Sequence, residues 1–104
     1  MEELKKAIET LSILELDRAN KKFPLFHSPH EGYAVIAEEM DEVRTEYEMM
    51  KYNREKFWQC VKYDENATET VEKLKYHAIS CAAELVQVIA MCDKYVDSMR
   101  RQRK

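Results

Sequence analysis

The stretch VEKLKYHAISCAAELVQVIAMCDKYVDSM, residues 71–99, decides the fold. Its apolar and small residues recur in alternating steps of three and four, so they share one side of an α-helix. These residues are Val71, Leu74, Ala78, Cys81, Leu85, Val88, Cys92, Tyr95 and Met99. A seam this long and regular is typical of a helix that packs nearly antiparallel or parallel to other helices in a bundle.

The composition excludes most other classes of fold. Of the 104 residues, one is Gly and two are Pro, which leaves little turn chemistry for a β-sandwich or barrel. A hydrophobic content of 45% is enough for a folded core and argues against intrinsic disorder. No apolar run approaches the roughly 20 residues that a membrane span needs. We therefore expect one soluble all-α domain over residues 1–104.

Two breaks in the apolar pattern, at residues 23–32 and 64–68, divide the chain into three helical blocks. The first block is amphipathic and predicts a helix from about residue 2 to about residue 20. The third block predicts a helix that begins near Asn66 or Thr68 and runs close to the C-terminus.

The second block begins with the strongest local signal in the chain. Ser28, Pro29 and Glu31 have the spacing of an N-cap serine, a proline at the first helical position and a capping-box glutamate. A helix should begin there. Its apolar pattern allows the helix either to continue past Asn53 or to kink near it.

The expected architecture is an antiparallel bundle of three to four helices. Three helices of unequal length form a thin bundle, and a long uninterrupted seam usually needs more partners than that. We expect dimerisation to complete the bundle, which gives a homodimer or homotetramer.

The second and third helical blocks carry carboxylates that are candidates for chemistry. Glu38, Glu39 and Glu42 form an EExxE pattern in which Glu39 and Glu42 share one helix face. Like charges at this spacing repel, and hard divalent ions such as Mg²⁺ prefer oxygen ligands of this kind. Glu84 and Gln87 lie one turn apart in an otherwise apolar segment. In an antiparallel pair of helices, these four side chains could meet around a cation; alternatively, the glutamates are solvated or paired with Lys or Arg.

Two segments resemble a known family. The segment HEGYAVIAEEMDE, residues 30–42, and the segment AAELVQVIAM, residues 82–91, resemble the MazG-like branch of the all-α nucleoside triphosphate pyrophosphohydrolases. The likeness covers roughly residues 25–95. It implies a domain that binds Mg²⁺ or Mn²⁺ between an EExxE and an ExxD motif and splits nucleoside triphosphates into monophosphate and pyrophosphate.

The resemblance also assigns roles to individual residues. Glu39 and Glu42 would be metal ligands of the first motif, and Glu38 a further ligand or an acid beside the site. Glu84 would lead the second motif, with Gln87 as a ligand where the family has aspartate. An amide oxygen can coordinate a cation, but it carries no charge and cannot act as a general base. Glu38 or Glu39 is the candidate for accepting the proton of the attacking water.

Three functions remain open from the sequence. The first is the Mg²⁺-dependent pyrophosphohydrolase, acting on a nucleoside triphosphate in the cytoplasm. The second is a nucleotide-binding or protein-interaction module in which Gln87 marks lost or weakened catalysis. The third is an acidic helical protein with no nucleotide ligand, whose long seam forms an oligomerisation surface. The net charge of −3 argues against nucleic acid as a partner, and the odd number of cysteines, three, favours a reducing compartment.

Overall fold

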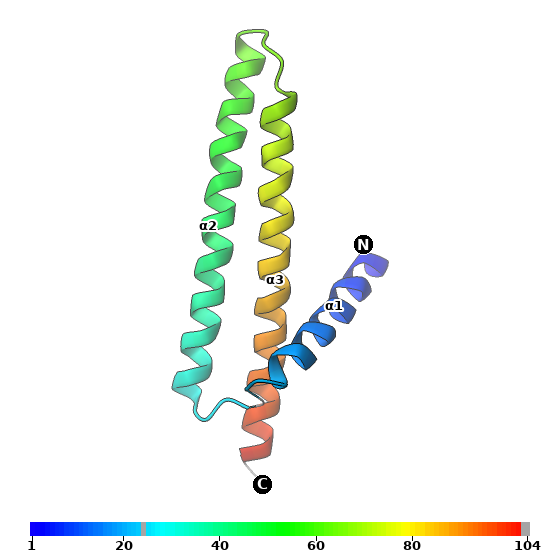
Figure 1. Cartoon of the computed structure of the whole chain (residues 1–104), viewed down its shortest axis with the longest axis vertical. Helices are drawn as coiled ribbons and strands as arrows, with labels where there is room; N and C mark the ends of the chain where they lie inside the picture. Colours follow the sequence, from blue (N-terminus) through cyan, green and yellow to red (C-terminus); the bar gives the residue numbers. More distant parts are fainter. Residues whose placement is uncertain (24, 103–104) are drawn as a thin grey trace.

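The structure, a computed structural model, describes residues 1–23 and 25–102, and this part of the chain is all-helical (Figure 1). It contains α1 (Glu2–Asn20), α2 (Pro29–Lys62) and α3 (Thr68–Gln102). The helices α2 and α3 form a long antiparallel hairpin, and α1 packs against α3. Within the described residues, no helix has an apolar stretch long enough to cross a membrane. The predicted all-α fold is confirmed, with helix bounds close to those expected.

The start of α2 has the predicted cap. The backbone N–H of Glu31 donates to the Ser28 hydroxyl at 3.1 Å, and Pro29 is the first helical residue. The Glu31 carboxylate accepts a bond from the backbone N–H of His27 at 3.3 Å, one residue before its usual capping-box partner. The helix continues through Asn53, whose side chain is buried and donates to the carbonyl of Met49 at 2.8 Å. Of the two possibilities at Asn53, the structure therefore shows continuation.

The turn between α2 and α3 lacks glycine but has the hydrogen bonds of a Schellman motif. Asp64 adopts a left-handed conformation with φ of 53°. The N–H of Glu65 donates to the carbonyl of Cys60 at 2.8 Å, and the N–H of Asp64 donates to that of Val61 at 3.3 Å. The Asn66 carboxamide then accepts from the backbone N–H of Thr68 at 3.0 Å. These local bonds reverse the chain within a few residues and bring α3 back alongside α2.

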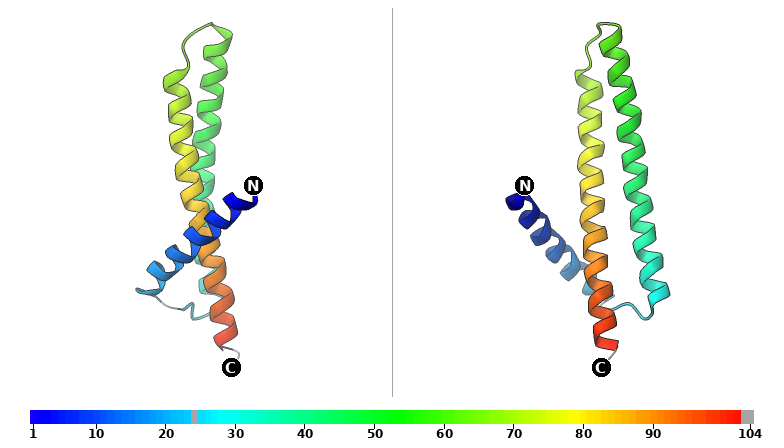
Figure 2. Two further views of the ribbon diagram at one scale, coloured as in Figure 1. Left: turned by 90° about the vertical axis from the view of Figure 1, so that its right-hand side faces the viewer. Right: turned by 180° about the vertical axis from the view of Figure 1, so that it is seen from behind.

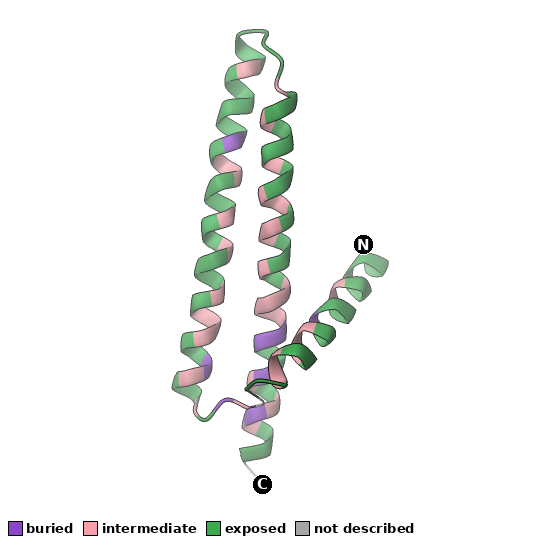
Figure 3. Ribbon diagram, in the orientation of Figure 1, coloured by how far each residue is buried: buried purple, intermediate pink, exposed green. Residues whose placement is uncertain are grey.

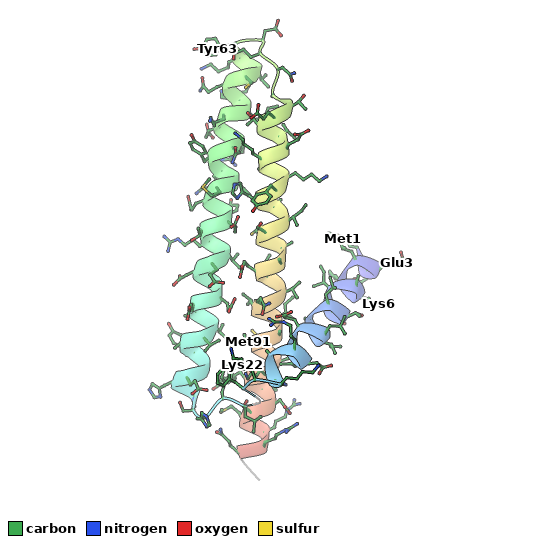
Figure 4. All side chains as sticks on the ribbon, viewed as in Figure 1. Met1, Glu3, Lys6, Lys22, Tyr63 and Met91 are labelled. Atoms are coloured by element: carbon green, nitrogen blue, oxygen red, sulfur yellow. The ribbon has the colours of Figure 1, made fainter. Side chains whose placement is uncertain are left out.

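The core is small and lies near one end of the molecule, where α1, the loop before α2 and the last third of α3 meet (Figures 3 and 4). Among the described residues, its buried hydrophobic members are Phe26, Ala90 and Met91. Gly32 of α2 lies so close to Tyr95 of α3 that an added Cβ would come within 2.4 Å of the tyrosine ring. Away from this end, the side chains of the hairpin are mostly exposed or half-buried.

Polar side chains on α3 fasten the loop before α2 over the core. The buried Ser98 hydroxyl accepts from the N–H of Phe26 at 2.9 Å and donates to the carbonyl of Lys94 at 2.7 Å. The Lys94 ammonium donates to the carbonyl of Phe23 and lies 4.9 Å from the centre of the Phe26 ring. Burial lowers the pKa of Lys94. The side-chain amide of Gln102 donates to the carbonyl of Phe26 at 2.7 Å.

The Ser98→Ala variant should be clearly less stable than the native chain. It leaves the buried N–H of Phe26 without an acceptor, which costs about 1–3 kcal/mol of unfolding free energy. Thr45→Ala is the matched control, because the Thr45 hydroxyl also donates to a carbonyl four residues earlier but is exposed and holds no loop. Urea denaturation of both variants measures the difference, and equal midpoints would show that this contact does not hold the loop.

Candidate metal centre

Three glutamates from two helices meet midway along the hairpin. Glu39 and Glu42 extend from α2 and Glu84 from α3, and one carboxylate oxygen of each lies within 4.8 Å of the other two. Glu39 and Glu84 are half-buried, whereas Glu42 is exposed. This group of three, the carboxylate cluster, is therefore enclosed by the helices on one side and open to solvent on the other. The structure thus brings together three of the four side chains predicted to ligate a metal.

The antiparallel register of the hairpin explains why these residues meet. On one side of the cluster, the Cys81 thiol of α3 lies 3.8 Å from the carbonyl of Val43 on α2. One turn further, Nδ1 of His77 lies 2.8 Å from the Glu46 carboxylate. On the other side, Gly32 packs against Tyr95. These pairs fix α2 against α3 both before and after the cluster, so the position of Glu84 opposite Glu39 and Glu42 follows from the packing of the helices.

The carboxylates perturb one another strongly. The pKa of Glu84 rises to about 7 because its carboxyl group hydrogen-bonds to Glu42, is partly buried and faces the charges of Glu42 and Glu39. The pKa of Glu39 is also raised, first by burial and then by Glu42, with a smaller effect from the charge of Glu38. Without a cation, the cluster therefore retains a proton up to about neutral pH. A proton held between carboxylates marks a place where a cation would relieve repulsion.

Because Glu84 binds a proton on folding, the stability of the metal-free protein should depend on pH. The pKa of Glu84 is higher in the folded chain than in the unfolded chain, so folding binds a proton between the ordinary glutamate pKa of 4.5 and about 7. The stabilisation from this proton is complete below the unfolded pKa and is lost as the pH rises through the folded pKa. We expect the thermal midpoint without metal to fall over this window in the native chain, and to fall less in Glu84→Gln. Parallel curves for the two proteins would contradict this coupling.

Two further residues were predicted to belong to the site, and the structure places both outside the three carboxylates. Glu38 is exposed beside Glu39 and adds negative charge. Gln87 is engaged with α1: its amide nitrogen donates to the Glu15 carboxylate at 2.6 Å. Gln87 has this partner because α1 packs against α3 at this level and offers a charged acceptor. The bond uses the amide nitrogen, so the expectation that the amide oxygen of Gln87 coordinates the metal with Glu84 stays a prediction.

The contribution of α1 near this site could not be predicted from the sequence. The Arg18 guanidinium donates to the same Glu15 oxygen that accepts from Gln87, and these two bonds lower the pKa of Glu15. Together the three side chains line a cleft of about 420 Å³ between α1 and α3. The spacing of Glu15 and Arg18 on one helix indicated an ion pair. No sequence pattern indicated that this pair would meet Gln87.

Comparisons of the chain with protein-family models, curated proteins and solved structures find no match. The donor atoms of the carboxylate cluster nevertheless define what it could hold. All three are carboxylate oxygens, the ligands that Mg²⁺ and Mn²⁺ prefer over the sulfur and imidazole ligands of zinc sites. The pKa of Glu84 is raised in part by the negative charges of Glu42 and Glu39, which a cation would offset. The residues therefore fit a hard divalent cation.

Proposed function

We propose that this protein is a Mg²⁺-dependent nucleoside triphosphate pyrophosphohydrolase. The observation that carries the proposal is the carboxylate cluster, in which Glu39 and Glu42 of α2 face Glu84 of α3. The same three residues stand at the motif positions by which the sequence resembles MazG-like enzymes. Two independent features, a resemblance along the sequence and a meeting of side chains in space, thus support one activity.

In this proposal, each residue has a stated task. Glu39, Glu42 and Glu84 would hold Mg²⁺, which neutralises phosphate oxygens and lowers the pKa of water when it is bound. Glu84 would release its proton as the ion binds. Glu38 and Glu39 are the candidates to accept the proton of the attacking water, and Glu38 is exposed where substrate can approach. The reaction adds one water, breaks the bond between the α- and β-phosphoryl groups, and yields a monophosphate and pyrophosphate.

Pyrophosphate release tests the proposal. The native chain is incubated with a panel of canonical and modified ribo- and deoxyribonucleoside triphosphates, with Mg²⁺, with Mn²⁺ or with a chelator. We expect release from at least one substrate, dependent on the metal. Silence across the whole panel, with circular dichroism showing a folded helical protein, would overturn the enzymatic proposal.

One observation favours a second candidate, a nucleotide-binding or protein-interaction module without catalysis. Gln87 contributes no charge and bonds to Glu15, so the second motif supplies one carboxylate instead of two. Nucleotide binding without turnover would be the signature of this alternative. For either function we propose a cytoplasmic setting, in agreement with the free thiols of Cys60, Cys81 and Cys92.

A further inference from the structure

An apolar groove lies between α1 and α3, away from α2. It has a volume of about 500 Å³, and no charged side chain lines it. Its larger lining residues are Ile8, Leu11, Ile79, Leu85, Val86 and Ile89. Figure 2 shows that α1 crosses α3 obliquely and that the N-terminal end of α1 projects away from the hairpin.

The apolar stripe of an amphipathic helix usually packs against a core, but much of the stripe of α1 faces solvent. Leu4, Leu11 and Leu14 are each more than half exposed. On α3, Ile79 is 61% exposed, and Leu85 is 47% exposed although it belongs to the predicted seam. Leu11 of α1 and Ile79 and Leu85 of α3 thus line one groove and remain largely exposed within the part of the chain that the structure describes. A continuous apolar surface of this kind marks an interaction site.

The total surface indicates how large a missing interface could be. The chain exposes 8160 Å², whereas a typical folded monomer of its mass, 12.4 kDa, exposes about 6,100 Å². The excess of about 2,000 Å² is more than the roughly 800 Å² that each partner buries in a standard protein interface. The exposed surface is therefore ample for a stable interface between copies.

We propose that a second copy of this chain occupies the groove, with α1 and α3 of each copy packed against α1 and α3 of the other. The exposed stripe of α1 outside the groove, which includes Leu4 and Leu14, supplies the apolar ridge that such a groove requires. Because each copy carries both the ridge and the groove, a two-fold axis places the ridge of each copy in the groove of the other. Because no charged side chain lines the groove, it has no group that would bind an acidic or a basic peptide selectively. This inference is independent of the proposed enzymatic activity.

Light scattering coupled to size-exclusion chromatography tests the inference on the full chain. The native protein should have twice the mass of 12.4 kDa, or a higher even multiple if dimers associate further. Ile79→Glu places a charge in the groove and should shift the mass to that of one chain. Val61→Glu is the matched control: Val61 is 54% exposed near the far end of α2 and lies outside the groove. It should leave the mass unchanged.

Other outcomes would overturn the inference. A native protein with the mass of one chain would do so, as would an Ile79→Glu variant that keeps the native mass. Loss of association in Val61→Glu alone would place the interface on α2 instead. If Ile79→Glu loses its helical circular dichroism, Leu11→Glu repeats the test from α1, where the side chain is 53% exposed. Association that survives Leu11→Glu would then count against the groove.

Discussion

Replacement of Glu84 by glutamine should reduce Mg²⁺-dependent pyrophosphate release on the order of 100-fold or more. Glu84 is the carboxylate that α3 contributes to the cluster, and the amide cannot supply its charge. Without that charge, the cluster would bind the cation less tightly and position the substrate phosphates less well. Steady-state rates at the Mg²⁺ concentration that saturates the native protein measure the effect. Raising the Mg²⁺ concentration should restore part of the loss, because weakened cation binding is one cause of it.

Glu55→Gln is the matched control for this experiment. Glu55 lies on α2, is exposed and pairs with the adjacent Arg54. The substitution therefore removes one negative charge outside the cluster. Its rate should equal that of the native protein. Glu39→Gln and Glu42→Gln should lose activity as Glu84→Gln does. A Glu84→Gln variant with native activity would show that the cluster is not the catalytic site.

The second large effect concerns stability. At about pH 8, above the pKa of Glu84, Mg²⁺ should raise the thermal midpoint of the native chain. A Mg²⁺ concentration 100 times its Kd stabilises the folded state by about 2.7 kcal/mol. For a domain of about 100 residues, each kcal/mol corresponds to roughly 4–8 °C. Differential scanning fluorimetry with Mg²⁺, with Mn²⁺ and with a chelator measures the shift.

Glu84→Gln should change both the stability of the metal-free protein and the increase in stability that Mg²⁺ causes. Because it removes repulsion among the three carboxylates, it should stabilise the metal-free protein at the same pH by about 1 kcal/mol after screening by solvent is allowed for. It should also remove most of the response to Mg²⁺. A variant that is less stable than the native chain in both conditions would instead indicate that Glu84 has a structural role. Equal Mg²⁺ shifts in both proteins would mean that the ion binds elsewhere.

The helices themselves could be predicted from sequence because their signals are local. The cap at Ser28 and the long seam of α3 act within a few residues of chain, and the structure shows helices with these bounds. The meeting of Glu39 and Glu42 with Glu84 was also predictable, because an antiparallel hairpin with a short turn leaves few registers. The side on which α1 would pack was not predictable, since an amphipathic stripe does not specify its partner.

The placement of α1 accounts for most of what the sequence did not indicate. Gln87 was expected beside Glu84, yet it donates to Glu15, a residue 72 positions away on a helix whose docking site was unknown. Lysine side chains usually lie at the surface, yet Lys94 is buried beneath the loop that follows α1. The partner of Gln87 is thus a residue of α1, and the partner of Lys94 is a carbonyl of the loop that follows α1. Such contacts depend on tertiary packing and leave no periodic trace in the sequence.

The central claim is that the carboxylate cluster binds one divalent cation between α2 and α3. Electron paramagnetic resonance of Mn²⁺, titrated into the protein at about pH 8, counts bound ions directly. We expect one tightly bound Mn²⁺ per chain in the native protein, displaced by excess Mg²⁺, and no ion of comparable affinity in Glu84→Gln. A native protein that binds no Mn²⁺, or a Glu84→Gln variant that binds it equally well, would contradict the claim.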